Sequence, residues 1–106
     1  MSSFGDAFTW VALQHSPGPA ASADEPIFAQ PMFREHVRFL QRMDELGYLV
    51  AAGPLEDAPG EGMTILRLPG AERLDEATRL ATEDDPSVVA GFFTVRVRPW
   101  QVMLAG

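Results

Sequence analysis

Hydrophobic and polar positions follow two periods along the chain, and together they predict six elements of secondary structure. Runs rich in aromatic and β-branched residues and bounded by turn residues predict four strands, at 8–15, 48–55, 63–68 and 91–98. Apolar residues at helical spacing predict two helices, at 33–46 and 74–83. Gly47 stands where helices commonly end on glycine. Residues 16–26 form an eleven-residue connector, which we expect to be mobile or to act as a lid.

The order strand, helix, strand, strand, helix, strand predicts an α+β protomer of the ferredoxin-like βαββαβ type, with both helices on one face of the sheet. The strands nevertheless carry apolar residues on both faces. In strand 8–15, Phe8, Trp10 and Ala12 lie opposite Val11 and Leu13, and in strand 63–68, Met63 and Ile65 lie opposite Leu66 and Leu68. Leaving one such face in water would cost several kcal/mol at about 25 cal/mol per Å². We therefore expect a homodimer in which a second copy packs its sheet against this one.

Composition and charge narrow the class of protein. The 106 residues fit a single domain spanning 1–106, and a hydrophobic content of 46% is typical of a folded soluble protein. With 15 acidic and 8 basic residues the net charge is −7, so we expect neither nucleic acid nor an anionic membrane as a partner. The absence of cysteine, of an export signal at the N-terminus and of a run of ~20 apolar residues favours a cytoplasmic location.

His36 is the first candidate for chemistry, because it lies among apolar residues. At about 100° per residue, the apolar residues of helix 33–46 cover an arc of about 180°, and His36 falls near its middle. A buried imidazole needs hydrogen-bond partners, since each unsatisfied group costs about 1–3 kcal/mol. The helix alone leaves two interpretations equally open, a structural histidine bonded to a backbone carbonyl and a functional one.

Asp85 precedes Pro86, which disfavours helical geometry in the residue before it, so helix 74–83 must end here. One interpretation is an N-cap for a short turn at 86–90, which is worth ~1 kcal/mol and needs no active site. The predicted topology also places this segment beside the first helix, where Asp85 could meet His36. A carboxylate there would fix the imidazole tautomer and produce a general base near neutral pH.

Four stretches in a fixed order carry a resemblance to a known family: HSPGP, EHVRFLQRMDELGYLVAAGPL, LDEATRLATEDDP and the closing VRPW. With them the chain resembles, over nearly its whole length, the YciI-like (YCII-related) family of the dimeric α/β-barrel superfamily. The resemblance implies a ferredoxin-like protomer, a homodimer with facing sheets and a His–Asp active site. The histidine of the family's helix motif matches His36, the aspartate of its DP motif matches Asp85, and its GP turn matches Gly53 and Pro54.

The resemblance supports the site more than any substrate. One branch of the family eliminates chloride from a chlorinated hydroquinone, whereas most members have no assigned reaction. The connector at 16–26 is longer than in the leaner members of the family, which leaves the shape of the pocket mouth open.

Other candidate residues are weaker. His15 looks like the end of an exposed strand edge and is structural or solvated, although His15 and Ser16 could line the pocket if the first strand ends there. With Gly53 and Pro54 they form the predicted substrate-binding set. Two histidines at unrelated positions offer too few ligands for a metal site, and neither HxxxH nor EF-hand spacing occurs. The glycines fit no nucleotide fingerprint, so we expect neither metal nor cofactor.

The sequence favours a small cofactor-independent enzyme of the isomerase or lyase type. His36 would move a proton, Asp85 would orient it, and an apolar cleft would hold a small metabolite, for which an aromatic ring is one option. One alternative is a non-catalytic small-molecule-binding or accessory protein, and another, by fold analogy alone, is a cofactor-independent oxygenase. An enzyme requires the His36 imidazole to face a pocket within about 3 Å of Asp85, whereas a sealed pair favours a structural role.

Overall fold

A computed structural model describes residues 7–106 of the chain. Its elements are β1 (Phe8–Pro17), the 3-10 helix η1 (Ile27–Ala29), α1 (Phe33–Glu45), β2 (Leu49–Pro54), β3 (Gly62–Pro69), α2 (Leu74–Glu83), α3 (Pro86–Val89) and β4 (Phe93–Pro99). The six predicted elements are present, and α2 has its predicted bounds. Strand β4 begins later than predicted because Gly91, with φ 77°, belongs to the left-handed turn that follows α3. None of the helices within residues 7–106 is long and apolar enough to span a bilayer.

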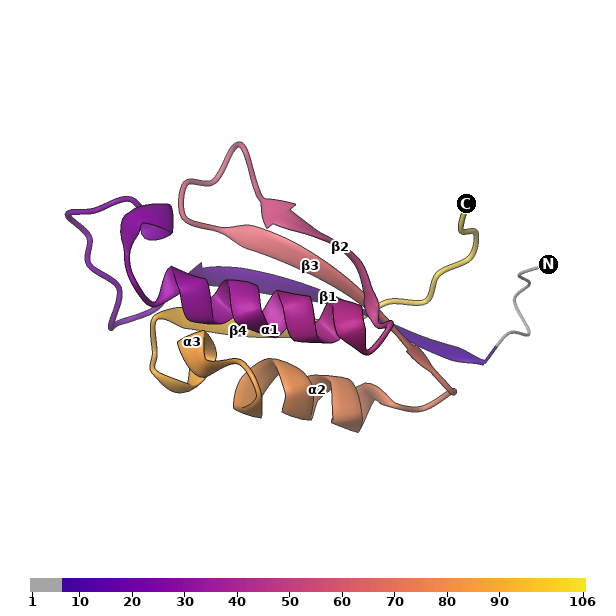
Figure 1. Ribbon diagram of the computed structural model, residues 1–106. Helices are drawn as coiled ribbons and strands as arrows, with labels where there is room; N and C mark the ends of the chain where they lie inside the picture. Colours follow the sequence, from indigo (N-terminus) through magenta and orange to yellow (C-terminus); the bar gives the residue numbers. More distant parts are fainter. Residues whose placement is uncertain (1–6) are drawn as a thin grey trace.

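The four strands form one antiparallel sheet in the order β2-β3-β1-β4 (Figure 1). The fold is therefore α+β, and it is compatible with the predicted ferredoxin-like arrangement. The prediction that His15 ends an exposed strand edge is wrong. Strand β1 lies between β3 and β4, and His15 pairs with Gly62 on one side and Val95 on the other.

Both long helices cover the same face of the sheet. The core between helices and sheet consists of Val11, Leu13, Phe39, Met43, Leu66, Leu68, Ala77, Leu80 and Ala81. Helix α1 ends as its glycine predicts. Gly47 adopts φ 81°, its N–H donates to Asp44 O, and the N–H of Tyr48 donates to Met43 O, which is a Schellman motif.

The opposite face of the sheet carries the second apolar set predicted from the sequence. Phe8 is 36% exposed and Trp100 is 48% exposed, and the rings of Trp10 and Trp100 meet edge to face at 6.2 Å. The Arg67 guanidinium lies 4.8 Å from the Phe8 ring centre, where it covers part of the apolar surface. Within residues 7–106, no helix packs against this face, so its aromatic and aliphatic side chains remain partly in water.

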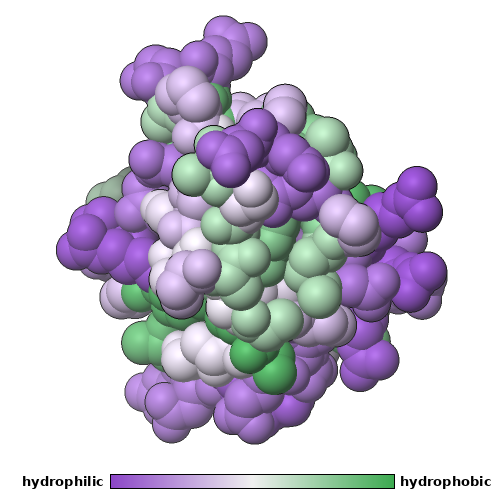
Figure 2. All heavy atoms as spheres, turned by 90° about the vertical axis from the view of Figure 1, so that its left-hand side faces the viewer, coloured by the Kyte–Doolittle hydropathy of each residue, from purple (hydrophilic) through white to green (hydrophobic). Residues whose placement is uncertain are grey.

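The connector between β1 and α1 is tied to the turn after α3. The N–H of Gly18 donates to Phe92 O at 2.7 Å, and the N–H of Ala20 donates to Gly91 O at 2.9 Å. The N–H of Ser22 donates to Gln30 Oε1 at 2.9 Å, and Gln30 Nε2 donates to the backbone oxygen of Ser22 at 2.9 Å. Figure 2 faces this end of the molecule and shows hydrophilic side chains around a paler and more apolar centre.

Gly18 packs so closely against the turn after α3 that no side chain fits there. A Cβ at Gly18 would collide with the backbone oxygen of Gly91, whereas a Cβ at Gly53 would meet no atom within 4 Å. We expect Gly18→Ala to lower the free energy of unfolding by about 1–3 kcal/mol, as overpacking commonly does. Gly53→Ala is the matched control and should change it by less than ~0.5 kcal/mol. Urea denaturation followed by circular dichroism measures both variants, and equal stabilities would contradict the close approach.

Candidate active site

Asp85 is the N-cap of the short helix α3, as one interpretation of the sequence predicts. Its backbone is extended, with φ −94° and ψ 105°, and Pro86 occupies the first helical position. The Oδ1 atom of Asp85 accepts two hydrogen bonds from Ser87, one from the backbone N–H at 3.0 Å and one from the hydroxyl at 2.7 Å. Both contacts fix the carboxylate in one orientation, with Oδ2 directed away from the cap.

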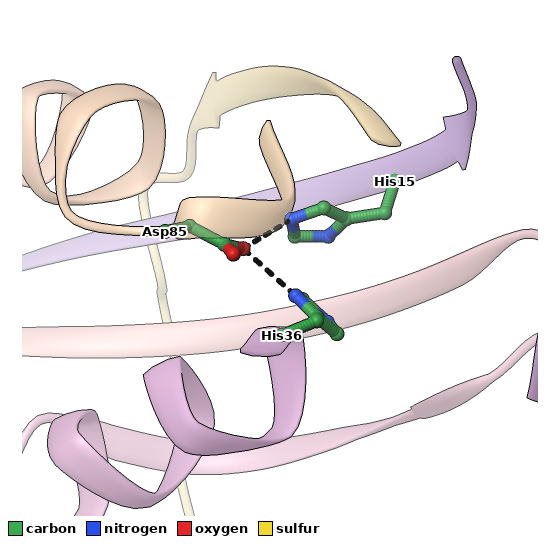
Figure 3. Close-up of side chains that lie close together, drawn as sticks. All are labelled: His15, His36 and Asp85. Carbon is green, nitrogen blue, oxygen red and sulfur yellow. Dashed lines mark hydrogen bonds and ion pairs between the residues drawn. The ribbon is translucent and has the colours of Figure 1, made fainter. Parts of the chain in front are cut away.

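The second carboxylate oxygen of the same residue meets His36. Helix α1 directs His36 toward α3, and its Nδ1 lies 2.7 Å from Asp85 Oδ2 (Figure 3). Because an ionised carboxylate only accepts hydrogen bonds, Nδ1–H is the donor, which leaves Nε2 of a neutral ring as an acceptor. The Asp85 side chain has no exposed surface, and 8% of the His36 side chain is exposed. The same carboxylate therefore caps α3 through Oδ1 and contacts His36 through Oδ2.

His15 is the third member of the cluster. It extends from β1 toward the same carboxylate, with Nε2 at 3.7 Å from Asp85 Oδ2, which is longer than a hydrogen bond (Figure 3). The ring centres of His15 and His36 are 4.5 Å apart. Only 2% of the His15 side chain is exposed, and within residues 7–106 neither of its ring nitrogens has a hydrogen-bond partner.

The electrostatics of the cluster follow from burial and these contacts. Burial by itself raises the pKa of Asp85, but the contacts with His15, His36 and Ser87 together outweigh it and hold the pKa well below its usual range. Burial lowers the pKa of His15, and the nearby Asp85 offsets only part of that effect. At neutral pH the Asp85 carboxylate is therefore charged, and the His15 imidazole is neutral.

A cavity of about 60 Å³ adjoins the two histidines. It lies between η1, the start of α1 and the end of the β2–β3 hairpin, at the end of the molecule seen in Figure 2. Its walls are formed by His15, Ile27, Phe28, Phe33, His36, Leu40, Ala52, Gly53, Pro54, Gly60, Glu61, Gly62, Met63, Thr64 and Phe93. The lining is predominantly apolar and aromatic, and Glu61 is its one acidic residue.

The structure brings most of the predicted site residues together. His36 and Asp85 are in contact, and His15, Gly53 and Pro54 line the cavity with His36. Ser16 is not among the lining residues, because successive side chains of β1 point to opposite faces of the sheet.

Three contributors to the site were missing from the sequence analysis. Ser87 anchors the carboxylate, while Phe33 and Phe93 supply aromatic walls, with the Phe93 ring 5.0 Å from the His36 ring. The burial of His15 could have been predicted. His15 lies two residues after Leu13 and four after Val11, so its side chain points to the same apolar face of β1 as theirs.

Comparison of the chain with protein-family models, with curated proteins and with solved structures finds no match.

The two histidines lie at unrelated positions in the sequence, and for this reason we expect no metal site from the sequence. The fold brings the two side chains together. His15, His36 and Asp85 each offer one ligand atom, and these atoms all lie within 4.8 Å of one another.

Replacing Ser87 tests how strongly the buried charge depends on its anchor. Ser87→Ala removes the hydroxyl donor to Asp85 and keeps the backbone N–H donor. Hydrogen bonds to charged groups are worth about 1.5–3 kcal/mol, so we expect the free energy of unfolding to fall by about that amount. Chemical denaturation measures the loss. Thr94→Ala removes an exposed hydroxyl 3.4 Å from Ser16 O and should cost less than ~0.5 kcal/mol. Similar losses in both variants would show that Ser87 does not anchor the carboxylate.

Proposed function

We propose that this chain is a YciI-like enzyme that uses His36 and Asp85 for acid/base chemistry on a small metabolite. The observation that carries the proposal is the 2.7 Å contact between His36 Nδ1 and a fully buried Asp85 carboxylate, with His36 in the wall of a cavity. This is the geometry expected of an oriented general base. The motifs quoted above support the family assignment, since in that family the matching histidine and aspartate form the site.

The proposed mechanism assigns a different task to each side chain. Asp85, fixed by Ser87, accepts the Nδ1–H of His36 and thereby keeps the other ring nitrogen, Nε2, free of a proton. Nε2 removes a proton from the ligand, and the carboxylate stabilises the imidazolium that forms. In an isomerisation, the electron pair left on the ligand forms a new double bond while an adjacent double bond opens, and the imidazolium returns the proton to the atom that receives those electrons. In an elimination, the pair forms a double bond while the bond to the leaving group breaks. The leaving group departs with that bond's electrons, and the imidazolium then releases its proton to water.

The cavity restricts the ligand. Phe28, Phe33 and Phe93 favour an apolar or aromatic group, and Glu61 disfavours an anion. At about 60 Å³ the cavity is far smaller than the ~300–1,000 Å³ of common ligand pockets. One protomer therefore has room for a molecule of few atoms or for part of a larger one.

The same small volume favours a second candidate function. With only 8% of the His36 side chain exposed, a ligand reaches the imidazole through a narrow opening. A protein that holds a metabolite without turnover would have the same arrangement. An assay of turnover distinguishes the two candidate functions, because only the enzyme converts the ligand that it binds.

We propose further that the chain forms a homodimer through the face of the sheet opposite the helices, as in a dimeric α/β barrel. The support is the apolar set on that face: its member Phe8 is 36% exposed, and Trp100, whose ring packs against Trp10 of the same set, is 48% exposed. A surface of this kind on a protein this small commonly marks a protein–protein interface.

The dimer predicts a mass of twice 11.6 kDa in light scattering at micromolar concentration. Ile65 lies in the middle of the open face, between Ala12 of β1 and Ala51 of β2. A charge at this position would be desolvated on association, so Ile65→Glu should yield a monomer. Gln41→Glu, on the exposed side of α1, should leave the dimer intact. A monomeric wild-type protein would contradict the proposal.

A metabolite screen by thermal shift tests the site. We expect at least one small apolar or aromatic compound to raise the unfolding temperature of the wild type and of Gln41→Ala, but not that of His36→Ala. Turnover of that compound should fall by about 10²–10⁴-fold in His36→Gln and Asp85→Asn, the range over which general acid/base groups act. Binding without turnover would favour the non-catalytic candidate, and equal stabilisation of the His36 variant would overturn both.

A further inference from the structure

The His15 side chain remains unexplained by the proposed chemistry. Its two ring nitrogens are buried, and within residues 7–106 neither has a hydrogen-bond partner. Almost all buried polar atoms in proteins have a partner, and an exception calls for a cause such as a bound ion. A ligand in the cavity is a poor cause here, because both nitrogens are shielded from solvent even though the ring lines the cavity. A partner for them must lie inside the cluster itself.

The ligand atoms of the cluster lie near the spacing of a three-ligand metal site. Asp85 Oδ2 is 2.7 Å from His36 Nδ1 and 3.7 Å from His15 Nε2, and the three ligand atoms lie within 4.8 Å of one another. Bonds of about 2.0–2.2 Å to one ion would place such atoms about 3–3.5 Å apart. To bind one ion, His36 Nδ1 would move away from Asp85 Oδ2, and His15 Nε2 would move toward both other ligand atoms.

We propose that His15, His36 and Asp85 form a binding site for one divalent transition-metal ion, such as Zn²⁺, inside the cluster and next to the cavity that the two histidines line. Two imidazoles and one carboxylate suit zinc and ions of similar ligand preference, whereas Mg²⁺ and Ca²⁺ prefer oxygen ligands throughout. The ion would give His15 Nε2 a partner. Three protein ligands leave at least one coordination position for water.

The surroundings of the cluster fit this role. Both hydrogen bonds from Ser87 go to Oδ1 of Asp85, so Oδ2 is presented to the ion in a fixed direction. The Phe93 ring packs against both imidazoles, with ring centres 5.5 Å from His15 and 5.0 Å from His36, which restricts their rotation. Partners that orient ligands in this way commonly change metal affinity by about 10–100-fold.

This inference goes beyond the proposed function. The ion would take the place of the proton between His36 Nδ1 and Asp85 Oδ2, so metal binding and proton transfer by that pair exclude one another. Metal affinity is measured without any assay of turnover. A negative result for one proposal therefore leaves the other proposal untouched.

The experiment uses untagged protein, freed of metal with a chelator and titrated with Co²⁺. The chain has two histidines and no cysteine, so side-chain nitrogen ligation that produces visible absorption must involve His15 or His36. We expect saturation at one equivalent, displacement of the Co²⁺ spectrum by Zn²⁺, and a higher unfolding temperature with either ion.

Variants locate the site. His15→Gln and His36→Gln should each weaken Co²⁺ binding by at least ~100-fold, since losing a ligand exceeds the effect of losing an orienting partner. Asp57→Asn removes an exposed carboxylate that neither belongs to the cluster nor lines the cavity, and it should bind Co²⁺ as the wild type does. His15→Gln retains a side chain of similar size, and circular dichroism verifies its fold.

Two results would overturn the metal site: binding well below one equivalent by the wild type, or unchanged affinity in folded His15→Gln. Either result, together with turnover that depends on His36 in chelator-treated protein, would overturn the metal site and leave the proposed function standing. Metal binding by a protein that turns over no compound would support the metal site and contradict the proposed enzyme function.

Discussion

The buried negative charge of Asp85 is the constraint on which this end of the molecule depends. A carboxylate without exposed surface is tolerable only if its oxygens have partners, because an isolated buried charge would cost far more than a small domain can spare. Its partners come from separate parts of the fold. Ser87 belongs to α3 and His36 to α1, while His15 of β1 lies 3.7 Å from the carboxylate without a hydrogen bond to it. The buried carboxylate thus links α3 to α1 beside the central part of the sheet.

The sequence predicts the parts of the site that depend on local chemistry. Pro86 marks the end of the preceding helix and the start of a short one, so Asp85 is recognisable as a cap. His36 is conspicuous because one polar residue interrupts an apolar helical arc. The Schellman end of α1 follows from Gly47 alone. Each of these features is settled within a few residues along the chain, where propensity and capping act.

The remainder depends on strand order, which local patterns do not contain. The sequence analysis places His15 at an edge because nothing near it in the sequence shows that β3 and β4 pair on either side of β1. Its face does follow from the sequence, because alternation along β1 places His15 on the side of Val11 and Leu13 and Ser16 on the other side. The cavity is even harder to predict from the sequence. Its walls come from η1, α1, the β2–β3 hairpin and β4, and their spacing is a property of the packed fold.

The three-residue cluster has one carboxylate for two imidazoles, and this imbalance determines its chemistry. Asp85 Oδ2 can accept a short hydrogen bond from only one ring in the present arrangement, and His36 at 2.7 Å has it, while His15 remains at 3.7 Å. A proton on Nδ1 satisfies His36 and leaves His15 without a partner. A divalent ion would coordinate His15 Nε2, His36 Nδ1 and Asp85 Oδ2 at once, but it would occupy the nitrogen that the carboxylate would otherwise keep protonated. The proposed proton transfer and the proposed metal coordination therefore compete for the same carboxylate oxygen.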